Sequence, residues 1–256
     1  MLVKPAISKL KLAREYGRFL IKRPDLPKQR FIIFGNGRSG STLLVNLLNS
    51  CDRIHCDGEI LNRPPLPLPN LFIKTQAARS PKPVYGFKLL DYHLKDLQKI
   101  ETPQKFLQTL HSQGWQFIYL IRQNKLHYAL SILNALHRQG FHHREDEGNL
   151  VRKKLWVDID RAMYWIRQGE ENTQYYNRIL QSIPHLKLTY EDNLSNAATH
   201  QDTADRVFDL LDLPRCEVES NLVKLMSAQA MQMVENKEDL VKALQKTKYA
   251  RFLDTA

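Results

Sequence analysis

The chain has 256 residues, enough for one substantial α/β domain with a buried core. Its formal net charge of +11 favours an anionic ligand, nucleic acid or an acidic surface as partner. Three cysteines without a C-x-x-C spacing argue against a disulfide framework or a zinc site and indicate a reducing compartment. The N-terminus is interrupted by charge, unlike a secretory signal, and no apolar run approaches the roughly 18 residues of a membrane span. These features predict a cytoplasmic protein without a transmembrane segment.

Residues 1–30 form a basic N-terminal segment. An apolar stripe passes through Leu12, Tyr16, Phe19 and Leu20, while Lys and Arg occupy the other faces. We expect a helix that packs on the domain and keeps a solvated basic face. Binding to a membrane surface is the alternative that the sequence leaves open.

Short apolar runs alternate with longer segments of helical periodicity along the rest of the chain. The runs predict buried strands at Phe31–Phe34, Val84–Leu89, Gln116–Ile121 and Leu186–Tyr190. The periodic segments predict helices at Ser41–Ser50, Thr102–Gln113, Lys125–Gln139, Trp156–Ile183, Asp202–Leu211 and Asn236–Gln245. This alternation predicts an α/β fold: a single P-loop-like domain with a central parallel sheet of about four to five strands and helices on both faces.

Two stretches predict loops. Asn62–Asn70 is rich in proline, which cannot continue a helix or a central strand, so we expect a stiff surface loop. His137–Lys154 is polar, glycine-punctuated and dense in charge. It is either a lid over a substrate or a solvated connector between helices.

The stretch FIIFGNGRSGSTLLVNLL, from Phe31 to Leu48, predicts a strand, a glycine-rich turn and a helix. Such a turn presents backbone N–H groups and the positive end of the helix dipole to an anion. Ser39, Ser41 and Thr42 add hydroxyl groups, one of which could cap the helix.

The turn differs from that of nucleotide triphosphatases, which need a lysine for the β- and γ-phosphates and an acid elsewhere for Mg²⁺. Ser41 occupies the lysine position, and the later strand FIYLI runs into Arg122, where a Walker-B strand would end in aspartate. The pattern therefore predicts a nucleotide with two separated anionic groups and no metal.

Two motifs carry a family resemblance. The pattern G-x-G-R-S-G-S-T-x-L after a strand resembles the 5′-phosphosulfate loop of sulfotransferases that use 3′-phosphoadenosine-5′-phosphosulfate (PAPS). Ile118–Ser131 resembles the family's 3′-phosphate segment, a strand ending in arginine followed by a helix bearing serine. Arg122 and Ser131 are nine residues apart, a spacing similar to that of the bacterial trehalose and nodulation-factor sulfotransferases. With weaker matches at Leu188–Leu194 and in the C-terminal helix, the similarity covers residues 31–253.

The resemblance implies a sulfotransferase that moves the sulfuryl group of PAPS to a hydroxyl of a small-molecule acceptor and releases 3′-phosphoadenosine 5′-phosphate (PAP) without a metal. An amino or guanidino acceptor stays open, as does the choice between a carbohydrate or glycolipid and a natural product. By the same resemblance, the residues that bind the cofactor are Gly37, Arg38, Ser39, Gly40, Ser41, Thr42, Leu43, Arg122, Ser131 and Tyr190.

Four residues are candidates for the chemistry. Arg38 matches the basic residue of the family's loop and would stabilise the leaving group; a surface ion pair is its alternative role. Glu59 matches the glutamate proposed as base in the bacterial branch, provided that partial burial raises its pKa; the alternative is a helix cap or a salt bridge. His55 is the rival base. Lys88, in an apolar run, needs a partner, which is either the transferring sulfonate or a structural carboxylate.

The other histidines that we considered, His93, His142 and His143, are expected to be surface or lid residues. A P-loop nucleotide kinase-like phosphotransferase and a basic nucleic-acid-binding domain are the competing functions. The missing loop lysine and Walker-B acid argue against the first. The lack of an RNP run, a zinc motif or a helix-turn-helix pattern argues against the second. The oligomeric state, including a homodimer, stays open.

Overall fold

A computed structural model describes residues 3–140, 154–220 and 230–253. The chain divides into two compact units. The first comprises residues 1–121 and 176–222, and the second comprises residues 122–175 and 223–256. Each unit is described by itself.

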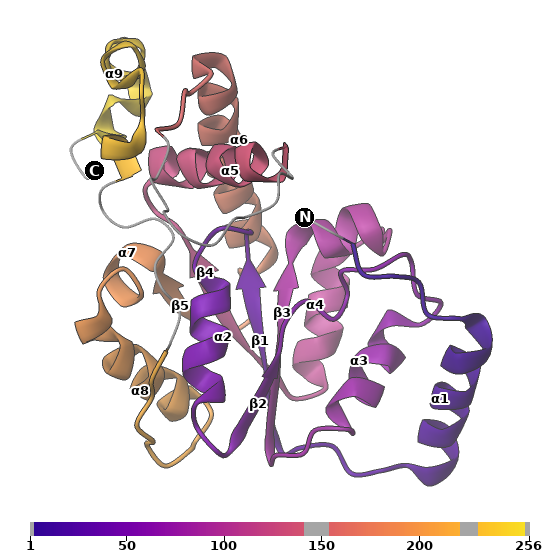
Figure 1. Ribbon diagram of the computed structural model, residues 1–256. Helices are drawn as coiled ribbons and strands as arrows, with labels where there is room; N and C mark the ends of the chain where they lie inside the picture. Colours follow the sequence, from indigo (N-terminus) through magenta and orange to yellow (C-terminus); the bar gives the residue numbers. More distant parts are fainter. Residues whose placement is uncertain (1–2, 141–153, 221–229, 254–256) are drawn as a thin grey trace, which may run out of the picture. The chain divides into compact units, whose positions relative to one another are not determined.

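The first unit contains a parallel sheet of five strands in the order β2-β3-β1-β4-β5 (Figure 1). The strands are β1 (Gln29–Gly35), β2 (Ile54–Asp57), β3 (Val84–Leu90), β4 (Trp115–Ile121) and β5 (His185–Thr189). The predicted α/β fold with a central parallel sheet is therefore confirmed. The edge strand β2 was not predicted as a strand, because its four residues alternate polar and apolar side chains too briefly to give a signal.

Helices of the first unit cover both faces of this sheet. They are α1 (Lys9–Lys22), α2 (Ser41–Asn49), α3 (Pro69–Ala77), α4 (Pro103–Ser112), α7 (Tyr190–Asn193) and α8 (His200–Leu210), with shorter turns η1 (His93–Leu97) and η2 (Ala197–Thr199). Helices α2 and α8 lie on one face and α3 and α4 on the other, with α1 outside α3 (Figure 1).

The alternation of side chains along β1 explains how both faces are buried. Phe31 and Ile33 point into a core shared with α2 and α8. Phe34 points to the opposite face, where its ring packs edge-on against Tyr176 with centroids 5.4 Å apart. Apolar burial on both faces is what the continuous apolar run of a central parallel strand requires.

Two predictions about the N-terminal part need correction. The loop predicted through Asn70 ends earlier, because α3 begins at Pro69; proline is tolerated in the first helical turn, where its missing N–H has no intrahelical partner. The N-terminal helix packs on the domain as predicted, with Leu12 and Tyr16 buried. Leu20, predicted to belong to the packed stripe, is 58% exposed.

The second unit is helical and has its own core. It comprises α5 (Lys125–Gly140), most of α6 (Ile159–Ile179), η3 (Ala230–Met233), α9 (Lys237–Gln245) and η4 (Lys248–Phe252). Leu130, Ile166, Leu240 and Leu244 are among the residues that fill this core. Most of the predicted lid, residues 141–153 with His142 and His143, lies outside the described residues. None of the helices in the described ranges combines the length and the hydrophobicity that a membrane span requires.

Candidate functional site

The glycine-rich turn connects the carboxyl end of β1 to the first turn of α2, at an edge of the sheet where α/β proteins bind ligands. Gly40 is the N-cap of α2 and has a φ of +88°, in the left-handed region that favours glycine. A Cβ atom at this position would lie only 2.7 Å from a ring carbon of Tyr190. The turn therefore packs directly beneath Tyr190, one of the predicted cofactor residues.

The hydroxyl residues of the turn have distinct roles. Ser39 is buried and donates a hydrogen bond of 2.8 Å from its Oγ to the carbonyl oxygen of Asn36, which closes the turn on itself. The N-cap of α2 is Gly40, which has no side chain, so the prediction of a hydroxyl cap was wrong. Ser41 is buried and Thr42 is exposed in the first turn of α2. The helix thus begins without a side-chain cap, which leaves the N–H groups of its first turn able to bind an anion.

Arg38 lies inside the turn and is exposed. Its φ of +63° is in the left-handed region, which non-glycine residues seldom adopt because the Cβ crowds the backbone. Such conformations cost roughly 1–3 kcal/mol and cluster at ligand sites. The backbone strain at Arg38 is therefore consistent with a turn shaped for a ligand.

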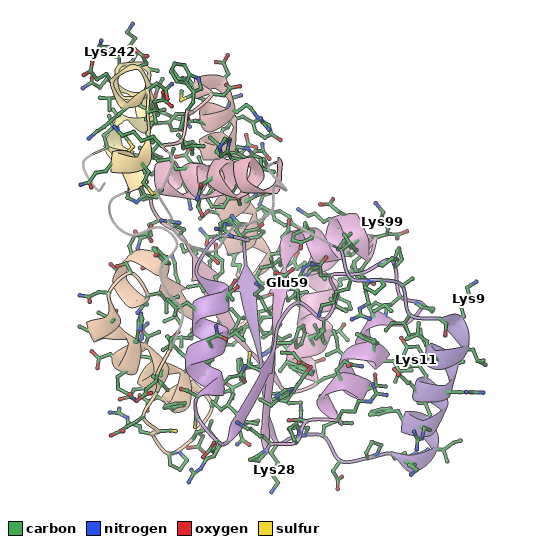
Figure 2. All side chains as sticks on the ribbon, viewed as in Figure 1. Lys9, Lys11, Lys28, Glu59, Lys99 and Lys242 are labelled. Carbon is green, nitrogen blue, oxygen red and sulfur yellow. The ribbon has the colours of Figure 1, made fainter. Side chains whose placement is uncertain are left out.

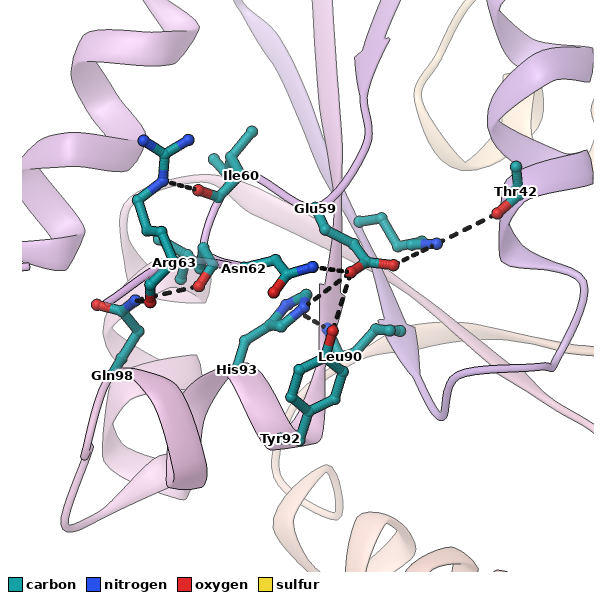
Figure 3. A network of polar contacts seen from close by, with 11 residues as sticks. Thr42, Glu59, Ile60, Asn62, Arg63, Leu90, Tyr92, His93 and Gln98 are labelled. Atoms are coloured by element: carbon teal, nitrogen blue, oxygen red, sulfur yellow. Dashed lines mark hydrogen bonds and ion pairs between the residues drawn. The ribbon is translucent and has the colours of Figure 1, made fainter. Parts of the chain in front are cut away.

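Lys88 connects the turn to a carboxylate. Its side chain, on β3 next to β1, is buried, and its Nζ lies 2.8 Å from Oε1 of Glu59. The same Nζ donates a hydrogen bond of 3.2 Å to Oγ1 of Thr42 (Figure 3). The prediction that Lys88 needs a partner is confirmed, and the structure brings Lys88, Thr42 and Glu59 together.

Glu59 follows the end of β2 and is surrounded by donors. Its second oxygen, Oε2, accepts hydrogen bonds from Asn62 Nδ2 at 2.9 Å and from the Tyr92 hydroxyl at 3.0 Å. His93 Nε2 approaches the same oxygen at 3.2 Å (Figure 3). The carboxylate therefore has partners on both oxygens and is held in one orientation.

The protonation state of His93 follows from its partners. The backbone N–H of Leu90 donates to His93 Nδ1 at 3.1 Å, so Nδ1 must be an acceptor without a proton. The proton of the neutral ring is then on Nε2, which donates to Glu59. Burial also lowers the pKa of His93, although Glu59 opposes that effect. The predicted surface position of His93 was wrong, because its side chain is fully buried.

The surroundings of Glu59 also overturn one expectation about its acidity. Burial alone would raise the pKa of Glu59, but hydrogen bonds from His93 and Lys88, together with the charge of Lys88, lower it to about 2. A rise in pKa was predicted for a general base. The carboxylate is ionised at neutral pH and stabilised by its donors, which makes it a weak proton acceptor.

The rival base, His55, lies elsewhere in the sheet. His55 is on β2 in register with Tyr85, three residues before Lys88 on β3, which places it roughly 10 Å along the strand direction from Lys88. Its Nε2 lies 3.4 Å from Oδ1 of Asp57, and its side chain is partly exposed. The structure therefore does not bring His55 into the Glu59 cluster.

The two residues predicted for the 3′-phosphate belong to the second unit. Arg122 directly follows the last residue of β4, and Ser131 is on α5; both are buried. Their role stays a prediction from the sequence.

Asn62, Tyr92 and His93 are the members of the cluster that sequence reasoning missed. Asn62 lies three residues after Glu59, close enough for its side chain to bond back across the turn. Tyr92 and His93 follow the strand that contains Lys88, so their place just after the carboxyl end of a buried strand is the signal that could have identified them.

Comparison with known proteins does not assign the chain to a family. No family model matches the chain, and no curated protein matches it.

Proposed function

We propose that the chain is a PAPS-dependent sulfotransferase that sulfates a hydroxyl group of a small-molecule acceptor. The observation that carries the proposal is the position of Lys88 Nζ, between Thr42 Oγ1 in the first turn of α2 and the carboxylate of Glu59. A cation, a helix N-terminus and a carboxylate meet there. Transfer of an anionic group to a hydroxyl needs these three elements: two to hold negative charge and one to accept a proton.

The residues of the turn fit a phosphosulfate. The left-handed glycine at the N-cap, the uncapped first turn of α2 and the exposed Arg38 together offer backbone N–H groups and positive charge to an anion. When bound, PAPS would supply the sulfuryl group and a leaving phosphate. Ser41, Thr42 and the backbone of the turn would hold the 5′-phosphate, and Arg38 would stabilise the charge that develops on the leaving oxygen.

Lys88 and Glu59 neutralise each other in their ion pair, and this pairing suggests how the base would be activated. An anion at the turn competes with Glu59 for the ammonium group of Lys88. Because Lys88 lowers the pKa of Glu59 through both a hydrogen bond and its charge, loss of that partner raises the pKa. Glu59 would then accept the proton of the acceptor hydroxyl while His93, Tyr92 and Asn62 keep it in place.

The position of Lys88 is also compatible with the competing function, a kinase-like phosphotransferase. Lys88 reaches the first turn of α2 from the neighbouring strand, so it could serve a triphosphate in place of the lysine that the turn lacks. A kinase-like phosphotransferase is therefore the alternative that the experiment must separate from a sulfotransferase.

Isothermal titration calorimetry with PAP, PAPS and ATP, each with and without Mg²⁺, tests the proposal. We expect PAP and PAPS to bind without Mg²⁺ and ATP to bind more weakly under both conditions. Lys88→Met should weaken PAPS more than PAP, because only PAPS carries the sulfonate, while Lys105→Met, at an exposed lysine of α4, should change neither. Preferred binding of ATP with Mg²⁺ would overturn the proposal in favour of the phosphotransferase.

A further inference from the structure

Helix α1 presents an apolar surface to solvent in addition to the one that it buries. Leu12 and Tyr16 are its buried residues, and the Tyr16 hydroxyl donates a hydrogen bond to the carbonyl oxygen of Leu68 just before α3. At about 100° per residue, Leu20 lies about 40° from Tyr16, and Leu10 and Ile21 lie about 120° and 140° from it, with only the small residues Ala13 and Gly17 in between. These three aliphatic side chains are 58%, 63% and 85% exposed. The apolar surface of α1 therefore extends well beyond the part that packs on the domain, and packing alone does not explain this exposed extension.

The neighbouring arc of the same helix is basic. Lys11, Arg14, Arg18 and Lys22 all lie there and are all exposed. The single acid of α1, Glu15, is on the far side of this arc; its side chain is only 10% exposed and forms an ion pair of 3.1 Å with Arg79. The solvent-facing surface of α1 is therefore an aliphatic stripe beside positive charge that forms no ion pair with the residues that the structure describes.

We propose that α1 is an interfacial helix that attaches the protein to an anionic lipid bilayer. An aliphatic stripe flanked by Lys and Arg is the pattern of helices that lie in the plane of a membrane surface. The stripe enters the acyl-chain boundary, and the basic arc meets the negative headgroups, which gives the surface its charge complementarity. Lys9, at the amino end of α1, is exposed on the opposite flank of the stripe and projects away from the sheet (Figure 2).

The composition of the stripe favours a bilayer over an acidic protein. Protein interfaces concentrate aromatic side chains at their buried centres, where a few such residues contribute most of the binding free energy. The exposed stripe of α1 is formed by Leu10, Leu20 and Ile21 and contains no aromatic residue. Because the buried face of α1 stays packed through Leu12 and Tyr16, attachment requires no unfolding of the helix. The proposal does not depend on the sulfotransferase function.

Vesicle flotation tests the proposal. We expect the full chain to float with vesicles of phosphatidylcholine and phosphatidylserine, and to stay in solution with vesicles of phosphatidylcholine alone. Raising the salt concentration should weaken the attachment, since charges near an exposed surface are screened.

Paired variants separate the charge from the apolar stripe. Arg14→Glu with Arg18→Glu should lower partitioning by at least about 25-fold, because each basic residue near an anionic leaflet contributes a factor of roughly five. The control, Arg53→Glu with Lys105→Glu, makes the same change in net charge at exposed residues outside α1 and should keep most of the binding.

Leu10→Ser with Ile21→Ser should lower partitioning by about tenfold or more. Leu68→Ser with Leu136→Ser, at exposed leucines outside α1, is its control. Circular dichroism confirms that each variant is folded.

Three results would overturn the proposal: no flotation with the anionic vesicles, equal losses in an α1 variant and its control, or binding that responds to charge but not to the Leu10 and Ile21 changes. Binding of a polyglutamate peptide through α1, without vesicle binding, would assign the surface to an acidic protein instead.

Discussion

Lys88 and Glu59 form an ion pair of 2.8 Å, and the lysine is shared with Thr42 at the start of α2. Lys88 lies on β3 and Glu59 lies in the segment after β2, and both side chains are largely buried. Each side chain therefore depends on the other as the counterion that keeps it charged in a buried position. Removing one partner leaves the other as a buried charge without its main counterion, which is costly in a protein interior.

The stability of the protein should depend on Glu59 in a pH range set by its pKa. The folded-state pKa of about 2 lies below the ordinary value of 4.5, so the contribution of Glu59 to the free energy of unfolding is fully present above about pH 4.5. It is lost as the pH falls towards 2. Glu59→Gln should lower the free energy of unfolding by up to about 3 kcal/mol at neutral pH, and the difference from the original chain should vanish near pH 2. Urea unfolding across this range measures it, with Glu101→Gln, at an exposed carboxylate, as control. A difference that persists unchanged down to pH 2 would contradict the prediction.

Removing Lys88 should raise the pKa of Glu59. Lys88 lowers that pKa through a hydrogen bond and through its charge, whereas burial acts in the opposite direction. We expect the carboxyl carbon of Glu59 to titrate at a higher pH in Lys88→Met than in the original chain when followed by ¹³C NMR. Lys105→Met is again the control. An unchanged titration would mean that His93 alone sets the acidity of Glu59.

The ring of His93 should be neutral at pH 7, with its proton on Nε2. The N–H of Leu90 occupies Nδ1, and an imidazolium, which has no acceptor, would leave that N–H without its partner. Long-range ¹H–¹⁵N correlation spectra distinguish the two tautomers and the charged ring. A protonated Nδ1 would show that the hydrogen bond with Leu90 does not form.

Substitution of Gly40 should disturb the turn much more than substitution of Gly37. Gly40 has a positive φ, and a Cβ there would collide with Tyr190 at 2.7 Å; at Gly37 a Cβ would meet only Leu90 Cδ1 at an ordinary 3.8 Å. Gly40→Ala should therefore cost roughly 1–3 kcal/mol of stability, while Gly37→Ala should be close to neutral. Thermal unfolding of the two variants checks this. Equal shifts would show that the turn adapts to a side chain at either position.

Arg122→Ala should weaken PAP binding if the 3′-phosphate role predicted from the sequence is right. Hydrogen bonds to charged groups contribute about 1.5–3 kcal/mol each, so the loss should be at least tenfold in Kd. Arg167→Ala, at an exposed arginine of α6 in the same unit, should leave the Kd unchanged. An unaltered affinity in Arg122→Ala would remove this residue from the proposed site and leave the turn after β1 to be tested separately.

Long apolar strands and the glycine-rich turn were predictable from the sequence, whereas contacts between distant segments were not. β1, β3 and β4 are fully apolar runs apart from Lys88 and a few terminal residues, so each run identified its strand. β2 has four residues and no such run. Glu59 and Lys88 were each identified, but their pairing depends on the register of β2 against β3, which one sequence does not contain. For the same reason the low pKa of Glu59 was not foreseen, since His93 and Lys88 reach it only in the folded chain.

Because β2 lies at the edge of the sheet, the segment that contains Glu59, the candidate base, could open locally. Among the strands that the structure describes, β2 pairs with β3 alone, and its four residues end just before the segment that contains Glu59. Edge segments with few main-chain bonds open at a lower free energy than a central strand does. The side-chain bonds of Glu59 to Lys88, Tyr92 and His93 therefore act as a clasp that closes this edge. These contacts predict slow hydrogen exchange of the amide protons of residues 58–62. A mutation that breaks them would displace Glu59 from the candidate site while the rest of the protein stays folded.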